Sequence, residues 1–203
     1  LEMKEKRIIR AGDDLRGLIR LKSDIIVFDN GDVTISGTNT YSGTTTTGTS
    51  AVNASLTFNG NHTGGGAYVA NNNAVFAGTG TTDSVLTVGA SAILSPGVDG
   101  IGILSTGGLV LNGTLSVDVD NTTGVAGTDW DQVAVTGTVT ISSGATLGVV
   151  VALVDENDQV ITNSTPVTFT SRCVQEGSGT IDTQVNTING TANATYRDLS
   201  CAG

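Results

Sequence analysis

The residues best placed to do chemistry are aspartates spaced two positions apart. Asp118 and Asp120 form one such pair, and Asp129 and Asp131 form another. Positions two apart on a β-strand point to the same face, so each pair would present two carboxylates together. Carboxylate oxygens are the hard ligands that Ca²⁺ prefers, which makes these four residues the calcium candidates. The chain has neither an EF-hand loop nor a Gly-rich calcium nonapeptide, so solvated turns are the simpler interpretation.

Paired carboxylates are also the machinery of glycoside hydrolysis, in which one acid protonates the leaving group opposite the second carboxylate. Asp129 and Asp131 flank Trp130, the one tryptophan of the chain. Aromatic platforms for sugar rings are otherwise scarce, because only three Tyr and four Phe accompany it. We therefore expect no enzymatic activity, and a polysaccharide-active β-helix enzyme is the least favoured alternative.

Nucleophilic catalysis lacks its usual motifs in this sequence. There is no Gly-x-Ser-x-Gly elbow, and the single histidine, His62, lies in the Gly- and Asn-rich run 59–66, where it is predicted to be a surface loop residue. The glycine groups at 64–66 and 78–80 are predicted to be turns, since no helix follows to place its N-terminus against a phosphate. No cofactor is expected other than the calcium ion considered above.

Charge excludes two classes of partner. The formal net charge of −10 and the pI near 4.2 would repel nucleic acid and anionic lipid surfaces. No apolar run approaches the roughly 20 residues that span a membrane as a helix, so we expect no membrane insertion within this segment. The basic residues are concentrated at the start of the chain, where seven of the nine lie in the first 22 positions: Lys4, Lys6, Arg7, Arg10, Arg16, Arg20 and Lys22.

The elements that must position these groups are predicted to be short strands. Residues 1–24 are the one stretch with helical spacing, so residues 1–30 are predicted to be a basic N-terminal segment, either a helix or a fusion remnant. From Gly31 onward, alternating Val, Thr, Leu and Ala runs end at Gly, Asn or Ser-Gly. Such runs are typical of β-solenoid coils, in which each coil buries its apolar face against the next. They include 33–35, 54–58, 85–88, 109–111 and 114–119.

Several of these runs carry a family resemblance. Val33-Thr-Ile-Ser-Gly-Thr-Asn-Thr-Tyr-Ser-Gly43 is similar to the opening of the autotransporter-associated β-strand repeat, and 91–97, 102–107, 109–115 and 129–137 follow in the order of that family. The resemblance covers residues 31–149. It implies a right-handed parallel β-helix exposed on a bacterial cell surface, with no catalytic residues in the repeat itself. A β-sandwich-like body is the alternative all-β architecture.

The chain changes character near residue 150. Residues 154–171, with Cys173, 187–196 and Cys201, resemble part of a bacterial Ig-like domain of the intimin and invasin type. Residues 150–203 are therefore predicted to form a partial Ig-like module. Because its leading and final strands are missing, we expect its sheet either to pair with the last solenoid coils or to receive strands from a neighbouring chain.

Cys173 and Cys201 occupy matching positions of that Ig-like pattern, and the resemblance therefore implies a disulfide between them. A disulfide requires an oxidising compartment such as the cell exterior. Two reduced, buried thiols are the alternative. Metal binding by the cysteines is disfavoured, because His62 is the only histidine and the chain has no closely spaced Cys pair.

These observations predict a non-catalytic, extracellular structural or adhesive protein of the bacterial cell surface, such as a stalk or passenger segment. Its partners would be other copies of itself, neighbouring surface modules or a receptor that the sequence does not identify. The alternative is a subunit of an extracellular filament. In that case the basic N-terminal segment, or the strand at Ile25–Phe28, would complete the Ig-like sheet of the next copy by strand exchange.

Overall fold

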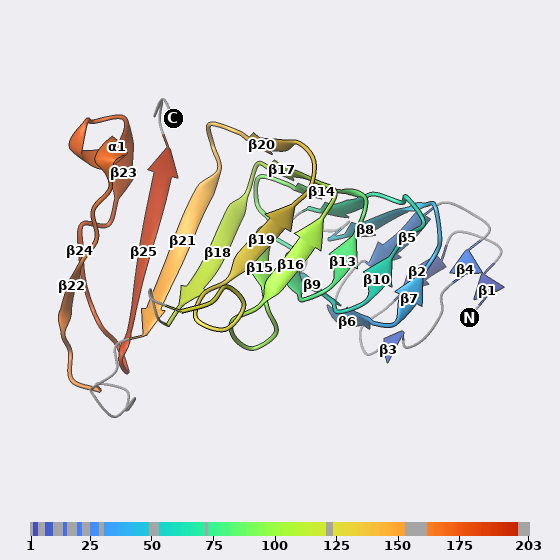
Figure 1. Ribbon diagram of the computed structural model, residues 1–203, viewed down its shortest axis with the longest axis horizontal. Coiled ribbons are helices and arrows are strands. Elements are labelled where there is room, and N and C mark those ends of the chain that lie inside the picture. The colour runs from blue at the N-terminus through green and yellow to red at the C-terminus, as the bar shows by residue number, and fades with distance from the viewer. Residues whose placement is uncertain are drawn as a thin grey trace.

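The computed structural model (Figure 1) describes residues 31–48, 53–71, 73–120, 124–152 and 162–198. It also describes the backbone of five short strands within the first 28 residues. Within these ranges the chain is almost entirely β, with a single short helix, α1 (Arg172–Gln175). The prediction of an all-β fold is confirmed. No helix in the described part of the chain is long and apolar enough to cross a membrane.

Three main sheets make up the body. The seven-stranded sheet contains β2 (Arg7–Ile9), β5 (Ile25–Phe28), β8 (Thr44–Thr47), β11 (Tyr68–Ala70), β14 (Val85–Val88), β17 (Gly108–Leu111) and β20 (Val139–Ile141). The five-stranded sheet contains β7 (Thr38–Asn39), β10 (Asn61–His62), β13 (Thr81–Thr82), β16 (Ile103–Thr106) and β19 (Gln132–Val135).

The third sheet has nine strands and includes the C-terminal ones. In spatial order these are β3 (Asp14–Leu15), β6 (Gly31–Ile35), β9 (Ala54–Phe58), β12 (Val75–Gly78), β15 (Ile93–Pro96), β18 (Thr114–Val119), β21 (Thr146–Ala152), β25 (Thr191–Asp198) and β23 (Gly179–Ile181). Two separate pairs complete the described strands: β1 (Glu2–Met3) with β4 (Arg20–Leu21), and β22 (Pro166–Thr168) with β24 (Gln184–Asn186).

The body is a parallel β-solenoid, because each strand from β5 to β18 pairs with the strand three elements later in the chain. One coil takes one strand from each sheet, as β9, β10 and β11 do before β12 returns to lie beside β9 (Figure 1). Register follows from the alternation of the sequence. The inward residues Leu56, Phe76 and Leu94 are direct partners, because a shift of one residue would turn every apolar side chain to the solvent.

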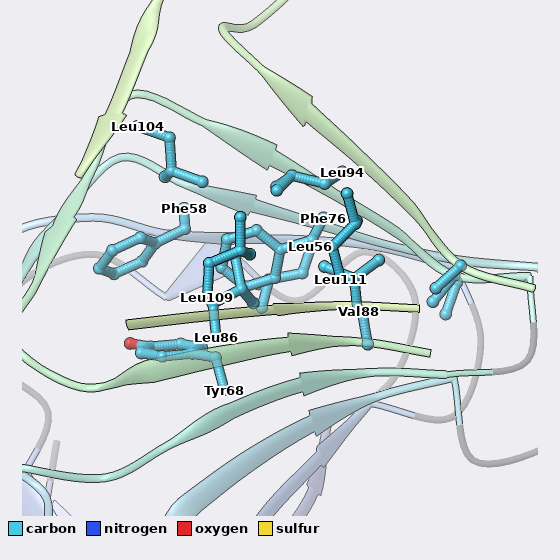
Figure 2. Packing of buried hydrophobic residues seen from close by; sticks show 14 of the residues in the cluster. Leu56, Phe58, Tyr68, Phe76, Leu86, Val88, Leu94, Leu104, Leu109 and Leu111 are labelled. Atoms are coloured by element: carbon cyan, nitrogen blue, oxygen red, sulfur yellow. The ribbon is translucent and has the colours of Figure 1, made fainter. Parts of the chain in front are cut away.

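The core is a continuous row of side chains along the solenoid axis. Figure 2 shows Leu56 and Phe58 of β9, Tyr68 of β11 and Phe76 of β12 meeting between the sheets. The rings of Phe76 and Tyr68 pack edge to face, with centroids 5.6 Å apart, and those of Phe58 and Tyr68 lie 5.0 Å apart. Such pairs add to the stabilisation that comes from burial of apolar surface.

Corners between the sheets need close backbone approach, and Gly78 shows why. Its φ is +125°, and a Cβ added there would lie 2.1 Å from the carbonyl oxygen of Phe58. Only glycine fits this position. Gly78 also exchanges two backbone hydrogen bonds with Gly97, at 2.8 and 2.9 Å, which fixes the start of the loop after β15.

The helix alternative for the N-terminal segment is wrong for the residues described there. They form strands that continue the ladders across the predicted boundary, since β5 pairs with β8 and β3 pairs with β6. Strand β5 is bonded on both edges, to β2 and to β8. The strand at Ile25–Phe28 is therefore not the free donor strand that the filament alternative requires.

The C-terminal strands join the solenoid, as one of the two expectations for the tail proposed. β21 pairs in parallel with β18 and antiparallel with β25, and β25 pairs antiparallel with β23. Figure 1 shows β25 beside β21 at the end of the body. Because β21 runs through the predicted boundary near residue 150, the two segments share one sheet. The Ig-like identity of residues 150–203 stays a prediction.

Candidate functional site

Asp131 is a buried anchor. Its side chain is 5% exposed, and its two carboxylate oxygens accept hydrogen bonds from the backbone N–H groups of Gly102, at 2.7 Å, and Asp118, at 2.9 Å. Burial raises the pKa of the Asp131 carboxyl, while the two amide bonds act in the opposite direction. Asp131 thus links the start of β19 to Gly102, just before β16, and to Asp118 of β18. Both of its carboxylate oxygens accept a hydrogen bond.

Asp129 is likewise engaged with backbone. Its carboxylate accepts a hydrogen bond from the N–H of Val125, and its carbonyl oxygen accepts one from the N–H of Asp120 at 2.8 Å. Trp130, the next residue, forms backbone β-bridges with Val119 and Ala126. Residues 129–131 are therefore held against the end of β18 by backbone contacts. The carboxylates of Asp129 and Asp131 thus both accept hydrogen bonds from backbone amides.

The four calcium candidates do not converge on one point. Within the described ranges, no group of three His, Cys, Asp or Glu side chains is placed to hold a metal ion. Asp129 and Asp131 are committed to backbone amides, whereas Asp118 and Asp120 face outward hollows of the surface. The backbones of the two pairs lie side by side, since Asp120 donates to the carbonyl oxygen of Asp129 and Asp131 donates to that of Asp118, but the four carboxylates do not gather at one point.

A groove lies on the outer face of the nine-stranded sheet. Its volume is about 350 Å³. Three successive coils supply the floor: β9 gives Ser55 and Thr57, β12 gives Val75 and Ala77, and β15 gives Ser95. The loop between β15 and β16, residues 97–102, forms the wall through its first four residues, and Asp118 of β18 also lines the groove. We call this hollow the 97–102 groove.

The wall of the 97–102 groove is held at both ends. Gly97 is fixed by its two hydrogen bonds to Gly78, and Gly102 donates to Asp131. Between them Gly97, Asp99 and Gly100 take φ values of 90°, 54° and 153°, and a Cβ on Gly97 would lie 1.8 Å from the carbonyl oxygen of Gly100. The loop therefore stands over the sheet as a preformed wall.

The chemistry of the groove is that of a binding surface. In the described structure, no hydrogen bond occupies the hydroxyls of Ser55, Thr57 and Ser95 or the carboxylates of Asp99 and Asp118. Val75, Ala77 and the exposed Val98 add an apolar patch. No histidine, cysteine or basic side chain lines it. Sequence reasoning missed this groove; its local signal was the Gly97-Val-Asp-Gly100 turn directly after the short strand Ile93–Pro96.

His62 lies inside the solenoid, which corrects its prediction as a surface loop residue. It belongs to β10 and is fully buried. Its ring stacks on Tyr41, with centroids 4.3 Å apart, and its Nε2 donates to the carbonyl oxygen of Tyr41 at 2.7 Å. The hydroxyl groups of Tyr41 and Tyr68 are hydrogen-bonded at 2.9 Å, and Thr45 donates to that of Tyr41 at 2.8 Å. This is a polar section of the core, closed to solvent.

The burial of His62 predicts acid-sensitive stability. Burial lowers its pKa below 6.5, although the bond to Tyr41 and the charge of Asp83 act in the opposite direction. The unfolded chain therefore binds a proton at higher pH than the folded one, and the contribution of neutral His62, complete above pH 6.5, is lost as pH falls toward the lowered folded value. Urea unfolding midpoints should fall between pH 7 and 5.5.

The control for this prediction is His62→Gln, which keeps an N–H for the carbonyl of Tyr41 but does not titrate. Its unfolding midpoint should change less with pH over the same range than that of the native chain. Carboxylates titrate in both proteins, so the difference between the two slopes isolates the imidazole. Equal slopes would refute the assignment.

The predicted disulfide lies partly outside the described residues. Cys173 is in α1, where its carbonyl oxygen accepts a hydrogen bond from the N–H of Ser178 at 2.8 Å. Cys201 is outside the described ranges. The pairing of the two cysteines stays a prediction.

The chain was compared with known proteins at three levels. No family model, no curated protein and no solved structure matches it. The geometry of the described residues is thus the basis for any functional assignment.

Proposed function

We propose that this chain is a non-catalytic structural and adhesive element of a bacterial cell surface, a stalk or passenger segment that projects a binding face. The observation that carries the proposal is the unbroken parallel ladder of the body. In each of the three main sheets, strands from successive coils pair in register. A solenoid of this kind is an extended rod in which each coil is stabilised by its neighbours.

The hydrogen bonds of the ladder favour a mechanical role. In parallel sheets between coils, the backbone bonds run along the solenoid axis, so a load applied along the rod is shared by bonds in three sheets. The buried apolar row of residues such as Leu56, Phe76 and Leu94 reinforces them. A rod built in this way would hold a surface groove at a distance from the cell.

The hydrogen bonding of the aspartates favours a role in ligand binding over a role in catalysis. Asp129 and Asp131, the pair proposed for hydrolysis, are engaged with backbone amides. The carboxylates that do line the 97–102 groove belong to Asp99 and Asp118. The groove offers ligand contacts without an activated nucleophile or a histidine base.

A flow experiment tests the proposed function. Beads carrying the chain would be passed over layers of epithelial cells, bacterial cells and deposited extracellular polysaccharide, beside beads carrying an unrelated protein of equal negative charge. We expect shear-resistant retention on at least one surface, with no soluble product released from a panel of polysaccharides. Release of reducing sugar would replace the proposal with an enzyme, and retention no greater than that of the control beads would refute adhesion.

A further inference from the structure

Resting on the proposed adhesive function, the geometry points to a ligand class for the 97–102 groove: we propose that it binds an uncharged, hydroxyl-rich saccharide chain lying along the solenoid axis. Three properties of the groove carry the inference. They are its floor of unengaged hydroxyl groups, its closed backbone edges and its two carboxylates.

The floor presents two parallel rows of side chains. Ser55 is the direct partner of Val75, while Thr57, Ala77 and Ser95 form the neighbouring row across three coils. Adjacent coils are about 4.8 Å apart, a repeat similar to the length of one sugar ring in a linear chain. Hydroxyl groups both donate and accept hydrogen bonds, so they match the hydroxyls of a saccharide in either orientation.

The closed edges argue against an extended peptide as the ligand. A peptide is commonly recognised when it adds a strand to a free sheet edge. Strands β9, β12 and β15 under the groove are each paired on both sides, with β6 and β18 as the outer neighbours. Recognition here must therefore use side chains, which favours a ligand whose own surface is covered with donors and acceptors.

The two carboxylates of the groove disfavour negatively charged ligands. Asp99 and Asp118 are acceptors for sugar hydroxyls, and they repel the carboxylates and sulfates of acidic saccharides. No described basic residue lines the groove to offset them. A metal ion is disfavoured as the occupant, because among the described residues no three His, Cys, Asp or Glu side chains are grouped to hold one. The apolar patch of Val75, Ala77 and Val98 suits the C–H face of a pyranose ring.

The test uses neutral oligosaccharides of four to six residues, namely gluco-, manno- and galacto-oligomers, beside galacturonate oligomers of equal length. Binding to the native chain would be measured by saturation-transfer NMR and calorimetry. The groove variant is Thr57→Val with Ser95→Ala. The matched control is Thr87→Val with Ser105→Ala, which removes the same hydroxyls from half-buried outward positions on β14 and β16.

We expect at least one neutral oligomer to bind, about tenfold weaker binding by the groove variant, and unchanged binding by the control, since each lost hydrogen bond accounts for part of that factor. Failure of every neutral oligomer to bind, equal binding of the galacturonate series, or equal loss in both variants would overturn the inference. Shear-resistant bead retention that survives the groove variant would also overturn it, while leaving the proposed adhesive function intact.

Discussion

Replacing Phe76 with alanine is expected to lower the free energy of unfolding by about 3–5 kcal/mol, which is the usual cost of deleting a buried aromatic ring and leaving a cavity. The Phe76 side chain is 1% exposed. It contacts the rings of Phe58 and Tyr68, with centroids 6.2 and 5.6 Å away, so two successive coils lose packing at once. Urea denaturation followed by circular dichroism measures the change.

The matched control for Phe76→Ala is Val85→Ala. Val85 lies on β14 but is 45% exposed, so its truncation should change the free energy of unfolding by no more than about 0.5 kcal/mol. Phe76→Leu, which keeps most of the volume, should fall between the two. If Phe76→Ala were as stable as Val85→Ala, the packed row through the solenoid would not be the main source of stability.

Loss of the predicted Cys173–Cys201 disulfide is expected to cost about 3–4 kcal/mol. The cysteines are 28 positions apart (201 − 173), and closing a loop of that size restricts the unfolded chain by about this amount in the chain-entropy description. The enclosed segment contains β23, β24 and β25, so reduction should act first on the strands that extend the nine-stranded sheet beyond β21. Thermal unfolding with and without reductant measures the change.

The double variant Cys173→Ser/Cys201→Ser provides the control. It should unfold at the temperature of the reduced native chain and should not respond to reductant. Titration of two free thiols in the oxidised, folded protein would contradict the pairing, and so would a melting temperature that is the same in both redox states. Either result would support the alternative of two reduced thiols.

Strand positions are the feature that the sequence predicts best. The alternation in Ala54–Phe58 and Val85–Val88 places apolar residues at every second position, and both segments are strands with that face buried. The β-solenoid follows from the same pattern, because short strands ending at Gly or Asn recur too closely for large crossover connections. A physical rule that acts within five residues is enough for this level of prediction.

The N-terminal segment shows where local spacing misleads. Ile8, Ile9, Leu15 and Leu18 fit an imperfect helical period, yet Arg7–Ile9 and Asp14–Leu15 are strands. Each pairs with the following coil, through β5 and β6. A neighbouring ladder offers backbone partners to any segment that lies along it, and this gain outweighs a weak helix preference of the segment alone.

The acidic residues show the same limit at the level of sites. Asp118, Asp120, Asp129 and Asp131 share one spacing, but they have different fates: Asp131 anchors Gly102, which is 29 positions away in the chain. This hydrogen bond gives the Asp131 carboxylate a structural role, and it helps to hold the wall of the 97–102 groove. No property of the residues next to Asp131 carries that information.

By itself, the sequence determined the all-β class and the inward rows of Val, Leu and Phe, because these depend on composition and on a period of two. Only the tertiary structure decided that His62 is buried, that Ile25–Phe28 is paired on both edges, and that the loop after β15 lines one groove together with Ser55, Thr57 and Ser95. Those outcomes depend on which coils become neighbours, and stacking brings together residues separated by about twenty or more positions.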